Sequence, residues 1–134
     1  MRLLLDSHVF VWVKTAPQNI ISAARAAIID PDNEVYVSLA TAWELWIKHA
    51  KRPIAEFASV LDGGATAFLS AAHGSGIKLL NITLEHAETA STLPQIHRDP
   101  FDRMLIAQTM HEGLTLVTHD DVFDRYGGLR TLKT

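Results

Sequence analysis

The alternation of short apolar runs with longer amphipathic stretches is the feature that most constrains how this chain folds. Strand-forming residues dominate the short runs, and helical patterns of apolar residues separate them. We expect strands at Arg2–Leu5, Glu34–Ser38, Ile77–Leu80 and Leu114–Thr118, and helices at His8–Lys14, Ser22–Ile29, Leu39–Ala50, Ile54–Leu61, Ala65–Ala72, 83–93 and 99–113. Strands that alternate with helices predict an α/β fold in which helices cover both faces of a parallel sheet.

The length of 134 residues fits one compact domain over 1–134, and 48% hydrophobic residues suffice for one sizeable core. No apolar run reaches the roughly 18 to 20 residues that span a bilayer. Asp6 and His8 interrupt the apolar N-terminal segment, which also lacks the small-residue cleavage site of a signal peptide. Because the chain has no cysteine, disulfides and thiolate zinc sites are excluded. We therefore expect a cytoplasmic protein with no membrane partner.

The net charge of −3 argues against a protein that coats nucleic acid through a broad basic surface. Any contact with nucleic acid must then be local, and the basic residues that we consider for it are Lys48, Lys51, Arg52, Arg98 and Arg103. An excess of acidic residues suits metal binding instead, if the acids converge on one site.

Two aspartates lie just after predicted strands, at the edge of the sheet where α/β proteins bind ligands. Asp6 follows the first strand, and Asp120 follows the last one in the segment VTHD. Each has a structural alternative, since Asp6 is a good cap for the next helix and Asp120 is a good Asx-turn residue. Taken alone, capping explains Asp6 better than metal binding does.

Glu44 lies on the helix that follows the second strand. A projection at 100° per residue places it at the border of an apolar stripe that we expect to face inward: Ala40, Trp43 and Ile47. An ion pair with Lys48 at i+4 is the simpler interpretation of Glu44 alone. A carboxylate that turns inward needs a partner, and a metal ion would be one.

Asp102 is the most informative acid, because it shares a helix face with residues that we expect to pack inward: Leu105, Ile106 and Thr109. A helix that begins with Asp99 at the N-cap, Pro100 at the first position and Asp102 at the third is also structurally favourable. The structural and functional interpretations of Asp102 therefore have equal weight, whereas capping is the better explanation of Asp99.

Four carboxylates that converge at one sheet edge would repel one another, and a divalent cation would relieve that repulsion. Mg²⁺ and Mn²⁺ both prefer oxygen ligands. Such a site hydrolyses phosphodiester bonds with activated water and needs no side-chain nucleophile. The seven histidines form no HExxH motif, and GxxxxGK[ST] and GxGxxG loops are absent, which disfavours zinc, ATPase and dehydrogenase chemistry.

Three segments resemble the PIN-domain toxins of the virulence-associated protein C (VapC) type: LLLDSHVFVW, YVSLATAWELWIKH and LPQIHRDPFDRMLIAQTMHEGLTLVTHDDVF. They cover well over half of the chain, whereas residues 51–76 match least. The resemblance implies a PIN-like three-layer α/β/α fold with a central parallel sheet of about five strands. It also implies the toxin component of a prokaryotic type II toxin–antitoxin system, a Mg²⁺-dependent endoribonuclease in which Mn²⁺ can replace Mg²⁺.

The resemblance also assigns roles to residues. The acidic positions of the family, which are both catalytic and metal-binding, fall on Asp6, Glu44, Asp102 and Asp120. Asp6 and Asp102 would be the primary ligands. Ser7 and Thr118 match positions that often carry a hydroxyl, and relatives often have arginine where this chain has His119. Two further supporting residues follow from their positions in the sequence and not from the resemblance: Asp99 would cap its helix, and Arg103, next to Asp102, would bind phosphate or pair with an acid.

The resemblance further implies RNA as the substrate, a small VapB-type antitoxin as a partner, and a homodimer. Trp12, Trp46 and Phe57 could contribute to either protein surface, although core packing is the expected fate of each. Two alternatives stay open. One is a PIN-fold nuclease that acts on other nucleic acid such as DNA, and the other is a non-catalytic binding module, which the presence of all four acids disfavours.

Overall fold

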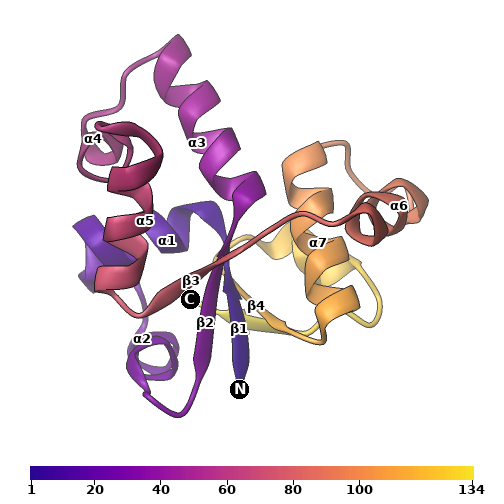
Figure 1. The fold of residues 1–134 in the computed structure, drawn as a ribbon. Helices are drawn as coiled ribbons and strands as arrows, with labels where there is room; N and C mark the ends of the chain where they lie inside the picture. Colours follow the sequence, from indigo (N-terminus) through magenta and orange to yellow (C-terminus); the bar gives the residue numbers. More distant parts are fainter.

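The computed structural model describes residues 1–134 and contains one five-stranded sheet in which all neighbouring strands are parallel. The strand order is β3-β2-β1-β4-β5, so the first strand of the chain lies at the centre (Figure 1). The strands are β1 (Arg2–Leu5), β2 (Glu34–Ser38), β3 (Ile77–Leu80), β4 (Thr115–Thr118) and β5 (Thr131–Lys133).

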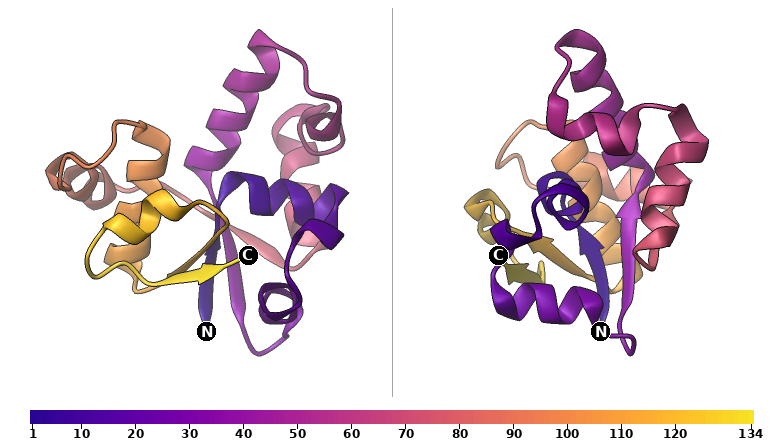
Figure 2. Two further views of the ribbon diagram at one scale, coloured as in Figure 1. Left: turned by 180° about the vertical axis from the view of Figure 1, so that it is seen from behind. Right: turned by 90° about the vertical axis from the view of Figure 1, so that its left-hand side faces the viewer.

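Helices cover both faces of the sheet, with α6 and α7 on one side and α1, α2, α4 and α5 on the other (Figures 1 and 2). In the same views α3 extends from the end of β2 beyond the sheet. The α-helices are α1 (Ser7–Thr15), α2 (Ser22–Ile29), α3 (Leu39–Lys51), α4 (Ala55–Leu61), α5 (Gly64–Gly74), α6 (Leu84–Thr92) and α7 (Pro100–Glu112). Two short 3₁₀ helices, η1 (Pro17–Asn19) and η2 (Asp121–Arg125), complete the fold. None of the helices has the length and apolar content needed to cross a lipid bilayer.

The alternation of side chains along β1 divides the interior into two cores. Leu3 and Leu5 belong to the larger core under α1, α2, α4 and α5, whereas Leu4 belongs to the smaller core with Leu105 and Ile106 of α7. All three leucines of β1 are fully buried, as expected for a central parallel strand that is covered on both faces. The two cores fix the sheet between the helix layers and hold the carboxyl ends of β1 and β4 side by side.

The predicted three-layer α/β/α fold is confirmed, and the predicted strands agree with β1 to β4 within one residue. The sequence pattern gave no indication of β5, because it has only three residues and lies at the sheet edge. Of the three aromatic residues that were expected to pack inward, Phe57 is buried, while Trp12 and Trp46 are partly buried against the larger core.

The predicted inward stripe of α3 is wrong at Trp43, whose exposure is 59%. The buried face of α3 instead includes Thr41, Glu44 and Leu45. Glu44 therefore belongs to the buried face and does not merely border it. The cause is the position of α3, since this helix packs against the start of α7 and against α4 and does not lie flat on the sheet.

Candidate active site

A polar pocket of about 180 Å³ opens at the carboxyl ends of β1 and β4, between α3 and the first turn of α7. No hydrophobic residue lines it. The lining residues are Asp6, Ser7, His8, Glu44, Lys48, Asp99, Asp102, His119 and Asp120. The structure therefore brings the four predicted site acids to one pocket, and places it where ligands bind in parallel α/β sheets.

Asp6 connects the ends of the two strands at the floor of the pocket. One carboxylate oxygen, Oδ1, accepts the backbone N–H of Ser7 at 2.7 Å, and Oδ2 accepts the hydroxyl of Thr118 at 2.7 Å. The Thr118 hydroxyl oxygen in turn accepts the N–H of Asp120 at 3.0 Å. Asp6 thus caps α1, as predicted, and its carboxylate is also held toward the pocket by β4.

Glu44 is also buried, with 5% exposure, and it has two partners. The Ser7 hydroxyl donates to Oε1 at 2.6 Å, and the Lys48 ammonium lies 3.3 Å from Oε2. The predicted i+4 ion pair therefore exists and coexists with an inward position in the acidic pocket. Ser7 and Thr118, the two expected hydroxyl positions, each orient one of the buried acids.

Asp102 occupies the first turn of α7, where its position is fixed by the helix start. Asp99 is the N-cap, as expected, and its carboxylate accepts the N–H groups of Phe101 at 2.9 Å and Asp102 at 3.4 Å. The side chain of Asp102 is 20% exposed, and its Oδ2 lies 3.3 Å from Nε2 of His97.

The pKa of Asp102 is raised to about 8, mainly by burial and then by the charges of Asp99, Asp6, Glu44 and Asp120, in that order of importance. Burial also raises the pKa of Asp6, although the hydrogen bonds from Thr118 and Ser7 oppose this effect. Both shifts mean that negative charge is costly here without a further cation.

Asp120 lies at the exposed rim of the pocket and caps η2 through its Oδ1, which accepts the N–H of Val122 at 2.9 Å. The predicted turn role is therefore present. The other carboxylate oxygen has no hydrogen bond within the protein. Asp120 can thus complete a set of oxygen donors around the pocket directly or through water.

The donor set fits a hard divalent cation. Five carboxylates line the pocket, whereas Lys48 is the one lysine or arginine among the lining residues. The carboxylates do not form a closed cage, because no group of three acids brings its ligand atoms within 4.8 Å of one another. Magnesium usually keeps several of its waters, so an open arrangement of this kind suits it better than a compact set of nitrogen or sulfur ligands.

A tighter cluster of potential ligand atoms, formed by His86, His111 and Glu112, lies at the opposite end of α7. Nδ1 of His86 accepts the backbone N–H of Thr83 at 3.0 Å, which requires the proton of the neutral ring to be on Nε2. Nε2 then donates to Glu112 at 2.8 Å. Because neither ring nitrogen keeps a free lone pair, we assign this cluster a structural role that joins α6 to α7.

Arg103 does not have the predicted role in phosphate or acid binding. Its exposure is 8%, and its guanidinium donates to four backbone carbonyl groups in the last turn of α6 and in the segment that follows it: Ala90, Leu93, Pro94 and His97. None of its hydrogen bonds is to a carboxylate, and the side chain fixes the segment before α7. The sequence suggested an active-site role only because Arg103 is adjacent to Asp102.

Two features of the site were not predicted. His97 lies against Asp102, and its other nitrogen, Nδ1, is 2.6 Å from the hydroxyl of Tyr126. On the opposite rim, the rings of His8, Trp12 and His119 gather with centroids 5.0 to 6.0 Å apart. The only sequence signal for His97 was its place immediately before the acidic segment at the start of α7.

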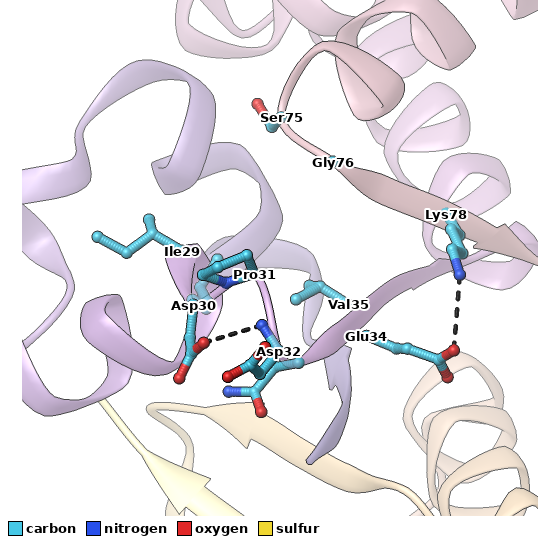
Figure 3. Close-up of a pocket in the computed structure, with 11 residues that line it drawn as sticks. Ile29, Asp30, Pro31, Asp32, Glu34, Val35, Ser75, Gly76 and Lys78 are labelled. Atoms are coloured by element: carbon cyan, nitrogen blue, oxygen red, sulfur yellow. Dashed lines mark hydrogen bonds and ion pairs between the residues drawn. The ribbon is translucent and has the colours of Figure 1, made fainter.

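A larger hollow, of about 770 Å³, lies at the opposite edge of the sheet, between the turn before β2 and the turn before β3 (Figure 3). Three of its four charged side chains, those of Asp30, Glu34 and Lys78, already have partners. Glu34 pairs with Lys78 at 3.7 Å and with Arg2 at 3.2 Å, and Asp30 accepts the N–H of Asp32 at 2.9 Å. This edge carries the amino ends of the strands, so we do not assign the site there.

The chain belongs to the PIN-domain family, whose sequence model matches residues 3–129. The resemblance to the VapC type is also confirmed. The chain is 33% identical over 125 residues to ribonuclease VapC22 of Mycobacterium tuberculosis, covering 88% of this chain and 86% of that protein.

Solved structures show the same fold. The VapBC2 complex of Rickettsia felis, bound to a promoter DNA fragment, matches with a TM-score of 0.71 and 15% identity over 99% of this chain and 98% of that one. The DNA-bound VapBC complex of Salmonella typhimurium matches with a TM-score of 0.66 and 19% identity over the same shares.

Proposed function

We propose that this protein is the toxin component of a type II toxin–antitoxin system and acts as a metal-dependent endoribonuclease. The observation that carries the proposal is the convergence of Asp6, Glu44, Asp102 and Asp120 on one pocket at the carboxyl ends of β1 and β4. Membership of the PIN family and the similarity to a protein named as a ribonuclease support it.

Mg²⁺ is the proposed cofactor, with Mn²⁺ as a substitute. Asp6 and Asp102 would be its primary ligands, and Glu44 and Asp120 would complete the site directly or through water. When bound, the cation would offset the repulsion among these acids, polarise the scissile phosphodiester and lower the pKa of water. The protein's own contribution is positioning. Thr118 and Ser7 hold the two most buried acids, and Asp99 fixes the start of the helix that carries Asp102.

The proposed partners are a VapB-type antitoxin and a second copy of this chain. The support for the antitoxin is that the similar solved structures are VapBC complexes. The exposed aromatic ring of Trp43 is a feature that a protein interface would cover.

Similarity to bacterial relatives supports a prokaryotic cytoplasmic location. The family match over 3–129 supports a single PIN domain over 1–134.

The experiment that tests the function is cleavage of labelled single-stranded RNA, structured RNA and DNA by purified protein. It is run with Mg²⁺, Mn²⁺ or a chelator. We expect RNA cleavage that requires the metal and that Asp6→Asn and Asp102→Asn each reduce by at least about 10³-fold. Asp32→Asn removes an exposed acid at the opposite sheet edge and serves as the matched control, with activity unchanged.

The alternatives give different results. A preference for DNA would favour the nuclease that acts on other nucleic acid. RNA binding with no cleavage under any metal would favour the non-catalytic module. Cleavage that survives the chelator, or that both active-site variants retain, would contradict the proposed chemistry.

A further inference from the structure

A second hollow of about 430 Å³ adjoins the acidic pocket and runs between α3 and the start of α7. We call it the α3–α7 groove, and its lining residues are Glu44, Ile47, Lys48, Lys51, Arg98, Asp99, Pro100 and Phe101. It shares Glu44, Lys48 and Asp99 with the acidic pocket, so the two hollows are continuous. The far part of the groove, however, has the opposite charge.

The cations of the groove follow from helix geometry. Residues 44, 47, 48 and 51 recur at the spacing that places side chains on one face of α3. Lys51 lies about 10 Å along the helix from Glu44, because each residue advances the helix by about 1.5 Å. Arg98, just before α7, faces the same hollow. Lys51 is therefore too far from the acids to act on the group that they hold, but it can contact the next part of a long ligand.

Lys51 and Arg98 are free to bind an anion. Both are exposed, and neither side chain has an ion pair or a hydrogen bond within the protein. Lys48, in contrast, is paired with Glu44. The helix start cannot take their place, since Asp99 already accepts the N–H groups of Phe101 and Asp102. On a chain with net charge −3, two unpaired cations in one groove are a local feature that suits a polyanion.

The wall of the groove adds an aromatic surface. Phe101 is partly buried, and its ring packs against the exposed ring of Trp43 with centroids 5.4 Å apart and an angle of 80° between the planes. Cations beside an aromatic ring are the combination that single-stranded nucleic acid uses, because phosphates bind the cations and bases stack on the ring.

We propose that the α3–α7 groove binds the nucleotides that flank the scissile phosphate on one side, with phosphates on Lys51 and Arg98 and a base against Phe101. The inference rests on the proposed function and adds the path of the RNA strand. Charge complementarity and continuity with the acidic pocket favour RNA over a protein partner as the occupant. These residues position the substrate and do not touch the reacting atoms.

The test measures binding separately from cleavage. A fluorescein-labelled single-stranded RNA of about 12 nucleotides, a length within the range of single-strand sites, is titrated into Asp102→Asn protein, and anisotropy is followed between about 50 and 200 mM salt. We expect Lys51→Gln/Arg98→Gln on this background to weaken binding about tenfold. The slope of log K against log salt should fall by about 1.4, since each phosphate contact on a single strand contributes about 0.7.

Two further variants separate phosphate contacts from general charge and from stacking. Arg25→Gln/Lys78→Gln removes the same charge outside the groove and should change affinity less than about twofold. Phe101→Leu keeps an apolar wall without the ring and should weaken binding about fivefold with an unchanged salt slope. In the Asp102-intact protein, the Lys51/Arg98 double variant should raise KM and leave kcat unchanged.

Equal RNA affinity with and without Lys51 and Arg98, in a protein that still cleaves RNA, would overturn the groove and leave the proposed function standing. Weakened antitoxin binding in the same variant would then identify the groove as a protein surface. A wild-type protein that cleaves no RNA, with the groove effect on binding intact, would overturn the proposed function and keep the groove.

Discussion

The two ends of α7 both gather ionisable side chains, but they accommodate the buried groups in different ways. At the C-terminal end, His86 is fully buried, and each of its ring nitrogens has a partner, Thr83 or Glu112. At the N-terminal end, Asp102 shares a pocket with four other carboxylates, and its pKa is raised to about 8. The first group is complete without a ligand, whereas the second keeps an electrostatic cost that a cation would remove.

The contrast shows that short distances between side chains are a poor guide to a metal site. The ligand atoms of His86, His111 and Glu112 lie within 4.8 Å of one another, yet the lone pair on Nδ1 of His86 already accepts the N–H of Thr83 and Nε2 carries the proton. The acids around Asp102 lie farther apart and lack sufficient countercharge. Substitutions at the two ends should therefore change stability in opposite directions.

The largest expected effect on stability is that of His86→Leu. This variant removes the side-chain half of the capping box of α6, in which Nδ1 of His86 accepts the N–H of Thr83, and the bond to Glu112, so the free energy of unfolding should fall by about 3 kcal/mol. RNA cleavage per folded molecule should stay within about twofold of wild type, because some ten residues of α7, or about 15 Å, separate the two ends. Urea unfolding and cleavage assays at low temperature measure the two quantities.

His111→Leu is the control, since His111 is exposed and contacts His86 only through its ring. Its effect on unfolding should be below about 0.5 kcal/mol. A His86→Leu protein that is as stable as wild type but does not cleave RNA would contradict the structural role of His86 and would place it in the active machinery.

The second prediction concerns pH and Asp102. The folded protein keeps the Asp102 proton up to about pH 8, whereas the unfolded chain releases it near the ordinary value of 3.8. The metal-free protein should therefore lose stability progressively as pH rises between these values. Asp102→Asn should remove this loss and be more stable than wild type at pH 8 without metal. Asp32→Asn should keep the wild-type slope.

Thermal unfolding in chelator from pH 5 to pH 8 measures this slope, and Mg²⁺ should flatten it by binding the ionised form. An Asp102→Asn protein that is less stable than wild type at pH 8 would mean that the acid pocket is already balanced without a cation. That result would contradict the claim that the Asp102 pocket, unlike the His86 cluster, needs a cation.

Apart from the control, the smallest expected effect is that of Glu112→Gln. The amide oxygen still accepts from Nε2 of His86, so the loss is only that of a charged acceptor, about 0.5 to 1 kcal/mol. Equimolar Zn²⁺ should shift the melting temperature of wild type and variant equally, since the cluster does not bind metal. A zinc stabilisation present in wild type and absent in Glu112→Gln would show that the cluster is a metal site.

The sequence was a good guide where local signals and topology agree. Asp6 and Asp120 follow recognisable apolar strands, and the carboxyl ends of parallel strands meet at one edge. The helix start at Asp99 and Pro100 was equally clear, because an N-cap acid followed by proline has few other uses.

Features that depend on packing could not be predicted. Helix α3 carries apolar residues on two stripes, so periodicity alone could not show that Trp43 is exposed and Leu45 buried. The carbonyl groups that bind Arg103 come from a segment whose path depends on α6. Likewise, the pairing of His97 with Asp102 and Tyr126 joins residues that only the folded chain brings together.

The most direct test of the central claim is a titration of ¹⁵N-labelled protein with Mn²⁺, followed by paramagnetic loss of amide signals. We predict that signals of Asp6, Ser7 and Asp102 disappear first, well before those of His86 and His111, and that Asp102→Asn abolishes this order. Signals that disappear first around His86 and His111, with the acidic pocket unaffected, would contradict the account.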